Sequence, residues 1–422
     1  MKQKIVPKGT MLAALDIGSH KNACFIGRVI DDQGGVEVLG VGHQASQGIK
    51  SGTVIDIDSA DHAIRQTVHA AENMAAPIMK GFPLREVIVN VPGSQTQSHN
   101  VQITVGIDGQ VVTDNDIARA LVKAQEQVIA PSTELIHTMP VNCRIDGHEG
   151  IRDPQGMMGQ DMEVDVHMVQ GDVGPLQNMA NCVERSHLDI GALCGSAYAA
   201  GLACLVEDEM DLGCTVIDMG AGVTSFAVFQ GGSMIYSGSI PLGGWHVTND
   251  IARGLTCPNN DAERLKTLYG SAMVTSSDES ELIDVPQLGE EDSHTPNHVP
   301  RSLLIGIIQP RLEEILEMVR TKLDESGHGK VVGRRMVLTG GASQLPGLRD
   351  LAQMILDKQV RLGRPIRLSG LPDAVSGSAF STVAGLLTYA ASHQHEMPAE
   401  IMASVDKGSA LNRFKIWWRE NW

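Results

Sequence analysis

Two stretches of the chain share one pattern of apolar and polar positions. In each, an apolar run ends in an aspartate, a glycine turn follows, and a second apolar run returns. The first stretch is 11–29 with Asp16 at its turn, and the second is 215–229 with Asp218 at its turn. This order predicts a tight β-hairpin in both places. Two copies, about 200 residues apart, predict two similar halves that face each other across a cleft.

The two turns carry residue types that suit a phosphate and a divalent cation. Gly220 and Gly222 lack a Cβ, so their turn can take positive φ and let an anion approach the backbone amides. Asp218 stands at the mouth of that turn, and carboxylate oxygens are ligands that magnesium prefers. Lys21 follows Ser19 by two residues, within reach of a phosphate at the first turn. An ordinary hairpin with a turn aspartate would explain either stretch alone, so the duplication carries the interpretation.

Between the hairpins, the pattern predicts a small inserted module. Its expected elements are a buried strand at 84–91, a polar-alternating stretch at 94–109, a helix from Thr113–Asp114 to about 130, and strands at 136–145 and 162–168. A packing helix at 59–79, capped near Asp58 and Ser59, precedes the module. A helical segment at 175–186 follows it. We therefore expect 84–169 to be an α+β insertion in the first half.

The chain after the module adds helices and a third glycine turn. The expected elements are a small-residue helix at 193–205, helices at 248–255 and 261–269, a helix at 303–323 interrupted at Pro310, a strand and turn at 336–343, and a helix at 346–357. The turn at Gly340 and Gly341 allows close approach of a flat base or its ribose. Glu263 and Lys266 share one helix face, which is also the pattern of a surface ion pair.

Composition and charge narrow the class of protein. The chain has 422 residues, of which 42% are apolar, and this is ample for buried cores. Its net charge of -17 argues against a nucleic-acid-binding body. The seven cysteines show no Cys-x-x-Cys spacing, as expected in a reducing cytosol. Residues 1–10 lack a signal-peptide core, and no window reaches about 18 apolar residues, so we expect a cytoplasmic protein.

The last residues differ from the body in both charge and pattern. Residues 391–406 lack periodicity and are typical of a linker. In 409–422, one narrow helix face would hold Leu411, Phe414, Trp418 and Trp422, with Trp417, Lys415 and Arg419 beside it. A basic, aromatic amphipathic helix fits an anionic membrane surface, although a helix docked on the protein's own body is the alternative. Such a short helix binds weakly, so stable attachment would need many tails at once, as self-assembly supplies.

Three motifs in this order resemble the nucleotide-binding signature of the actin, sugar kinase and Hsp70 superfamily. They are residues 16–19 as first phosphate loop, 218–222 as second phosphate loop, and 338–341 as adenosine loop. From about residue 10 to the end, the chain resembles the FtsA family of bacterial cell-division proteins. The resemblance implies an α/β, actin-like two-domain fold, with duplicated ribonuclease H-like halves around a nucleotide cleft, an inserted α+β subdomain and a C-terminal amphipathic helix.

The resemblance also implies a division of the chain. The expected parts are a first actin-like domain 1A (10–83, 170–205 and 366–391), the inserted subdomain 1C (84–169), a second actin-like domain 2A (206–235 and 306–365), a small subdomain 2B (236–305), a linker (392–408) and a membrane-targeting helix (409–422).

Site residues carry over position by position. ATP would be bound by Asp16, Gly18, Ser19, Lys21, Asp218, Gly220, Ala221, Gly222, Thr224, Gly243, Gly244, Glu263, Lys266, Gly340 and Gly341. Asp16 and Asp218 would hold Mg2+ through water. Hydrolytic superfamily members are similar in placing a Glu or Gln at the start of the small-residue helix, and here 193–196 offers neither. Binding is therefore better supported than turnover, and no catalytic residue is assigned.

The function implied by the resemblance is membrane attachment of a division filament. The protein would bind ATP, polymerise at the cytoplasmic face of the inner membrane, and tether FtsZ through the FtsZ C-terminal peptide on 2B. Later division proteins would bind 1C, and anionic lipids would bind the tail. Two alternatives stay open: a small-molecule kinase or phosphatase of the superfamily, which needs a substrate base in the cleft, and a pilus-assembly adaptor, which would lack the aromatic tail.

Overall fold

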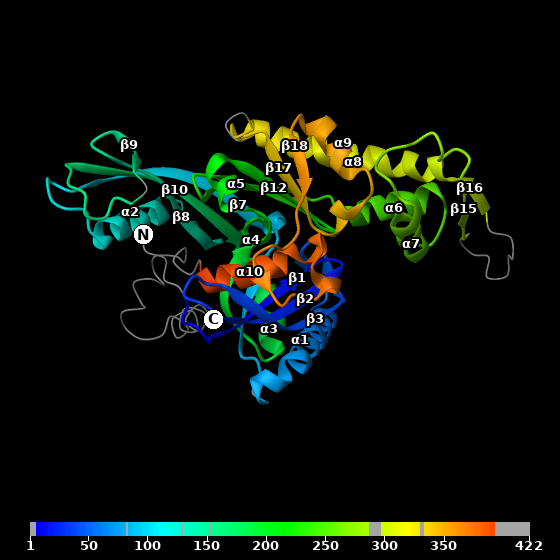
Figure 1. Ribbon diagram of the computed structural model, residues 1–422, viewed down its shortest axis with the longest axis horizontal. Helices are drawn as coiled ribbons and strands as arrows, with labels where there is room; N and C mark the ends of the chain where they lie inside the picture. Colours follow the sequence, from blue (N-terminus) through cyan, green and yellow to red (C-terminus); the bar gives the residue numbers. More distant parts are fainter. Residues whose placement is uncertain are drawn as a thin grey trace.

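Two mixed β-sheets with the same internal strand order form the centre of the molecule (Figure 1). The structure is a computed structural model that describes residues 6–392 except 82, 129, 131, 152, 287–296 and 330–332. In each sheet an antiparallel hairpin has a parallel strand beside its first strand: β6 beside β1, and β17 beside β12. The chain therefore builds one arrangement twice, as the repeated pattern predicted.

In the described part of the chain, the two sheets have six and five strands, in the following order across each sheet. The first sheet is β11 (Asp189–Gly195), β6 (Glu86–Val91), β1 (Met11–Ile17), β2 (Lys21–Val29), β3 (Val36–Ala45) and β19 (Leu368–Ser369). The second sheet is β14 (Ser233–Ile240), β13 (Thr224–Gln230), β12 (Cys214–Met219), β17 (Arg335–Thr339) and β18 (Gln359–Leu362).

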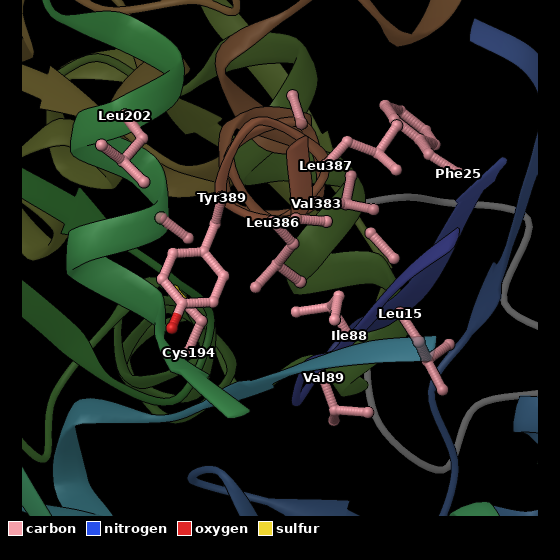
Figure 2. Packing of buried hydrophobic residues seen from close by; sticks show 14 of the residues in the cluster. Leu15, Phe25, Ile88, Val89, Cys194, Leu202, Val383, Leu386, Leu387 and Tyr389 are labelled. Carbon is pink, nitrogen blue, oxygen red and sulfur yellow. The ribbon is translucent and has the colours of Figure 1, made fainter. Parts of the chain in front are cut away.

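Helices cover both faces of the first sheet. On one side, α1 (Ile57–Met79) packs on β2 and β3, and α3 (Val173–Arg185) lies beside α1. On the other side, α10 (Ser381–Ser392) packs on β1 and against α4 (Ser196–Cys204). Figure 2 shows this layer, where Leu386 and Tyr389 of α10 lie between Leu202 of α4 and the strand residues Ile88 and Val89.

The second half has its own core of apolar side chains. The helices around its sheet are α5 (Glu207–Leu212), α6 (Gly244–Gly254), α7 (Asn259–Tyr269), α8 (Arg301–Glu325) and α9 (Leu348–Leu356), and β15 (Leu282–Val285) pairs with β16 (Asn297–Pro300) beyond α7. Figure 1 places α6, α7 and the β15–β16 pair at one end of the long axis.

The inserted module lies at the opposite end of the long axis (Figure 1). Its sheet has the order β7 (Thr96–Gly106), β10 (Asp161–Asp172), β8 (Thr133–Ile145) and β9 (His148–Ile151). The helix α2 (Asp114–Val128) covers one face through a separate apolar core that includes Ile117 and Leu121. The module thus contains the predicted helix and strands that overlap those predicted at 136–145 and 162–168, and its first strand, β7, lies in the stretch predicted only to alternate in polarity.

The structure corrects several predicted elements. The strand at 84–91 was assigned to the module, but β6 pairs with β1 and β11 in the first sheet. All of its residues after Glu86 are buried, since helices cover both faces of that sheet. The predicted helix at 193–205 begins only at Ser196, because 189–195 continue as β11. The α1 cap is Asp56, whose carboxylate accepts from the Asp58 and Ser59 amides.

Pro310 does not interrupt its helix, contrary to the prediction. The helix α8 runs through Pro310 from Arg301 to Glu325. A proline inside a helix removes one backbone hydrogen bond and costs about 3 kcal/mol. A line of buried side chains on both sides of it, which includes Leu304, Ile308 and Leu312, offsets that cost.

No helix in the described ranges is long and apolar enough to cross a membrane. The predicted linker at 392–408 lies outside the described residues, apart from its first residue. The predicted membrane residues Leu411, Phe414, Lys415, Trp417, Trp418, Arg419 and Trp422 also lie outside them.

Candidate functional site

A cavity of about 650 Å3 lies between the β1–β2 hairpin of the first half and the β12–β13 hairpin of the second. All the sequence-predicted binding residues except Thr224 and Gly243 line it. They are Asp16, Gly18, Ser19, Lys21, Asp218, Gly220, Ala221, Gly222, Gly244, Glu263, Lys266, Gly340 and Gly341. Residues from five separate stretches of the sequence therefore meet around one space.

The two hairpin turns require glycine for the same reason. A Cβ on Gly18 would lie 2.6 Å from the Lys21 carbonyl oxygen, and a Cβ on Gly220 would lie 2.8 Å from the Val223 carbonyl oxygen. In both turns the obstructing carbonyl is three residues further along the backbone. The Gly220 amide donates to that carbonyl, with N and O 3.0 Å apart. The bare backbone of both turns faces the cavity, as an anion site needs.

Two carboxylates and one ammonium set the electrostatics of the cavity. Burial raises the pKa of Asp16 to about 7, although Lys21 opposes the rise and Asp218 adds to it. Burial also raises the pKa of Asp218 to about 6, against a hydrogen bond from Thr382 and the charge of Lys21. Burial lowers the pKa of Lys21 to about 8. A divalent cation between the carboxylates would restore their ionised forms, so this donor set fits magnesium.

The cavity supplies only part of a metal coordination shell. Within the described residues, no group of three or more His, Cys, Asp or Glu side chains is placed to hold a metal ion. Magnesium in proteins usually keeps several waters and binds through one or two carboxylates together with substrate phosphates. Asp16 and Asp218 match that pattern.

Lys21 is held above an aromatic ring at the edge of the cavity. Its Nζ lies 3.4 Å from the centroid of the Phe380 ring and donates to the Ala379 carbonyl at 2.5 Å. A cation over an aromatic face is attracted by the ring quadrupole. The ammonium group is thus directed by the segment that precedes α10.

A hydrogen-bonded group forms the far wall of the cavity on α6 and α7. Lys266 Nζ lies 2.7 Å from Glu263 Oε2, and it donates to Thr248 Oγ1 at 2.8 Å and to the Gly244 carbonyl at 3.1 Å. Burial raises the pKa of Glu263, but the charge and hydrogen bond of Lys266 and the Thr248 hydroxyl outweigh it, so the net shift is downward. The alternative interpretation of these two residues as a surface ion pair is wrong, because they belong to a partly buried network that faces the cavity.

The third glycine turn closes the cavity beside Asp218. Gly340 has φ 88°, a left-handed conformation that favours glycine, and a Cβ there would clash with Asp218 Oδ1 and the Met219 backbone. The following residues form η2 (Gly341–Gln344), a short 3-10 turn. The turn therefore brings backbone next to the carboxylate with no side chain between them.

Thr224 and Gly243 lie behind the lining. The Thr224 hydroxyl donates to the Leu242 carbonyl at 2.8 Å, and Thr224 is fully buried. A Cβ on Gly243 would clash with the Gly220 carbonyl. Both residues support the second turn from beneath.

Sequence reasoning missed three residues that line the cavity and orient its groups. Asn90 Oδ1 accepts from the Ile17 amide at 2.7 Å, and its Nδ2 donates to Ser196 Oγ at 3.1 Å. Thr382 donates to Asp218 Oδ2 at 3.0 Å, and Phe380 lies under Lys21. Asn90 was detectable as one polar residue in an apolar strand. Thr382 and Phe380 gave no local signal.

The start of α4 has no acidic or amide side chain of its own. Ser196 lines the cavity there, and its hydroxyl donates to the Val91 carbonyl at 3.0 Å. The nearby amide, Asn90, comes from β6 instead. The sequence-based expectation of binding without an assigned catalytic residue stays a prediction.

Comparisons with known proteins cover nearly the whole chain. A family model described as "Cell division protein FtsA" matches residues 215–385, and one described as "SHS2 domain inserted in FTSA" matches residues 93–170. The chain is 41% identical to the cell division protein FtsA of Rhizobium meliloti, in an alignment that covers 97% of this chain and 95% of that one.

Two solved structures are similar in fold. A chain of the PilM-PilN type IV pilus biogenesis complex has a TM-score of 0.64 at 16% identity, over 90% of this chain and 98% of that chain. MreB5 of Spiroplasma citri bound to ADP has a TM-score of 0.53 at 13% identity, over 95% of this chain and 100% of that chain. The predicted actin-like fold with an inserted subdomain is confirmed.

Proposed function

The chain belongs to the FtsA family of cell division proteins, and we propose that it binds ATP with Mg2+ between its two halves and tethers FtsZ filaments to the cytoplasmic membrane. The observation that carries the nucleotide part is the pairing of Asp16 and Asp218 across one cavity, each with a raised pKa. The solved MreB5 structure, similar in fold, is bound to ADP, and this supports the same use of the cavity here.

The proposed site assigns one task to each wall. The backbone amides of the turns at Gly18 and Gly220, together with Ser19 and Lys21, bind the phosphates. Asp16 and Asp218 hold the cation through water, and bound Mg2+ supplies positive charge against the phosphate oxygens. Gly340 and Gly341 leave room for the nucleoside, with Glu263 and Lys266 on the facing wall.

The proposal makes nucleotide a structural ligand, with weak turnover if any. Asn90 and Ser196 occupy the region where a water-orienting carboxylate or amide would stand, and both are committed to structural hydrogen bonds. The bound nucleotide would then set the relative position of the two halves and hence the shape of a polymer subunit.

Membrane attachment and partner binding complete the proposal. The 409–422 tail would bind anionic lipids of the inner membrane at the division site, and self-assembly would supply many tails at once. The FtsZ C-terminal peptide would bind the 2B region (236–305), and later division proteins would bind the 1C module. The 41% identity to a cell division protein FtsA, in an alignment that covers 97% of this chain, favours this function over a pilus-assembly adaptor or a small-molecule kinase.

Isothermal titration with ATP, with and without Mg2+, tests the nucleotide site. Asp218→Ala should abolish the magnesium-dependent part of ATP binding, since it removes one of the two carboxylates. Asp208→Ala, an exposed aspartate at the start of α5, is the matched control. Unchanged magnesium-dependent affinity in Asp218→Ala would remove the carboxylate from its assigned role.

Sedimentation with anionic vesicles tests the tether. We expect the full chain to pellet with the vesicles and a chain truncated after Asp406 to stay in the supernatant. Equal pelleting of the two proteins would show that the tail is not the membrane anchor.

A further inference from the structure

A two-residue turn in the first half lies where both phosphate loops and the inserted module meet. It is the Ser51–Gly52 turn, between the short strands β4 (Ile49–Lys50) and β5 (Thr53–Val54). Ser51 has φ 49° and Gly52 has φ 80°, so both residues are left-handed. A serine in that region is uncommon and persists where surrounding contacts impose it.

The turn is hydrogen-bonded to the first phosphate loop. The Gly52 amide donates to Ser19 Oγ, with N and Oγ 2.9 Å apart, and both residues line the cavity. A serine hydroxyl has one proton and can accept as well as donate. Because Ser19 Oγ accepts from Gly52, its own proton is available for an acceptor in the cavity.

The turn also touches the second phosphate loop. A Cβ on Gly222 would lie 2.7 Å from Ser51 Cα and 2.8 Å from Ser19 Oγ. The two loops belong to different halves of the molecule, so any change in the separation of the halves at this point acts on the turn.

The carbonyl groups of the turn accept hydrogen bonds from the entrance to the module. Gln95 Nε2 donates to the Gly52 carbonyl at 2.5 Å, and Ser94 Oγ donates to the Ser51 carbonyl at 3.1 Å. Both donors belong to η1 (Gly93–Gln95), which continues directly into β7, the first strand of the module. Gln95 is buried, with 5% of its surface exposed, so its amide is fixed on the turn.

We propose that the Ser51–Gly52 turn couples the terminal phosphate of bound ATP to the inserted module, with Gln95 as the positioning residue. The inference rests on the proposed ATP binding. A phosphate oxygen that accepts the Ser19 proton fixes the hydroxyl rotor and strengthens the Gly52–Ser19 bond, because hydrogen bonds in a chain polarise one another. The ordered turn then holds Gln95 and the start of β7. In this proposal the accepting oxygen belongs to the terminal phosphate of ATP, which ADP lacks.

Hydrogen–deuterium exchange of the full chain with no nucleotide, MgADP or MgATP measures the coupling. In the wild type, MgATP should slow exchange at Gly52 and in 93–106 by about two- to tenfold relative to MgADP, the range of one hydrogen bond. Gln95→Met keeps the side-chain length but removes the donor, and it should erase the ATP–ADP difference in 93–106. The cavity should still be protected by either nucleotide.

Gln97→Met is the matched control. Gln97 lies two residues after Gln95, in β7, and is exposed. This variant should therefore keep the wild-type difference in exchange between MgATP and MgADP. If the Gln95→Met protein exchanges faster across the whole module without nucleotide, the substitution has disturbed the fold, and Ser94→Ala is used in its place. Because Ser94 is exposed, Ser94→Ala should reduce the MgATP–MgADP difference in 93–106 by less.

Each result supports or overturns a defined part. If both nucleotides protect the cavity of the wild type but exchange in 93–106 is the same with MgATP and with MgADP, the coupling alone is overturned. A Gln95→Met protein, or a Ser94→Ala protein where that variant is used, that keeps the full difference overturns the role of the turn. A wild-type cavity that neither nucleotide protects overturns the coupling together with the proposed ATP site.

Discussion

The two hairpins that face the cavity share one turn but supply different chemistry. Gly18 and Gly220 are both constrained by the carbonyl three residues ahead. The first turn then presents side chains, with the Ser19 hydroxyl and the Lys21 ammonium lining the cavity. The second turn presents the apolar side chains of Ala221 and Val223 in the same places, with Gly222 between them. The first turn therefore contributes an ammonium group and a hydroxyl donor, and the second turn contributes close approach of bare backbone.

This difference explains how one duplicated motif makes an asymmetric site. A phosphate that lies between two identical lysine-bearing loops would face two ammonium groups. Without the phosphate, the mutual repulsion of these two groups would destabilise the folded protein. With a lysine on the first loop only, the second loop can approach the ligand closely. Substitutions in each of the two loops test this division.

Removal of the charged contribution should have the largest effect. Lys21→Met deletes the ammonium group, and hydrogen bonds to charged groups contribute about 1.5–3 kcal/mol. ATP affinity in calorimetry should therefore fall about tenfold to a hundredfold. Lys50→Met, an exposed lysine in the same half, should bind as the wild type does. Equal affinity of Lys21→Met and Lys50→Met would refute the charge assignment.

Removal of close approach in the second half should have the next largest effect. Gly222→Ala places a methyl group 2.7 Å from Ser51 Cα, and overpacking of this kind costs about 1–3 kcal/mol. We expect about tenfold weaker ATP binding together with a lower thermal midpoint. Gly174→Ala is the control, because a Cβ there meets nothing within 4 Å. If the two alanine variants behave alike, the second loop does not depend on glycine.

The carboxylates should make magnesium-dependent binding depend on pH. A proton on Asp16, whose pKa is about 7, competes with the cation, so affinity should rise about tenfold from pH 6 to pH 8. Asp16→Asn should bind more weakly and show a flatter profile. A profile with the wild-type slope in Asp16→Asn would assign the titration to another group.

The same pKa shifts predict the opposite trend for stability without a cation. The folded protein holds protons on Asp16 and Asp218 that the unfolded chain releases above about pH 4. The free energy of unfolding should therefore fall as pH rises from about 4 to 7 and level off above that. Added Mg2+ with ATP should oppose this loss. Denaturant unfolding at several pH values measures it, and a rise over this window without ligand would contradict the assignment.

The smallest effect is expected at Ala221. Ala221→Gly gives the second loop a third glycine, and the added backbone freedom costs about 0.5–1 kcal/mol at most. ATP affinity should change by no more than about fivefold. A larger loss would mean that the alanine side chain itself contacts the ligand.

The repeated pattern of the sequence predicted both hairpins and most of the lining, because each motif is local. The turn residues at Asp16, Asp218 and Gly340 carry their signal within a few positions. The assignment of β6 to the module was wrong because a strand's partners are not encoded in the strand alone. Its neighbours, β1 and β11, lie about 70 and 100 residues away in the chain, and periodicity does not report pairing at such separations.

The missed residues have the same cause. Thr382 orients Asp218 across 164 positions, and Phe380 lies under Lys21 from the segment before α10. Nothing in their local sequence distinguishes them from other small or aromatic residues. The helix α8 shows the opposite case, in which a local signal was present but misleading. Pro310 predicted an interruption, and the burial of one face of the helix outweighs it. Apart from the start of the module, the predicted domain boundaries and the tail stay predictions.

Trp245, which lines the cavity at the start of α6, gives the protein a built-in optical probe. The chain has four tryptophans, and the other three are Trp417, Trp418 and Trp422. In a chain that ends at Asp406, all indole emission would come from the cleft. The difference between the emission spectra of the full chain and the truncated chain would then come from the three tail tryptophans. Tryptophan fluorescence can therefore report separately on the cleft and on the tail at a vesicle surface.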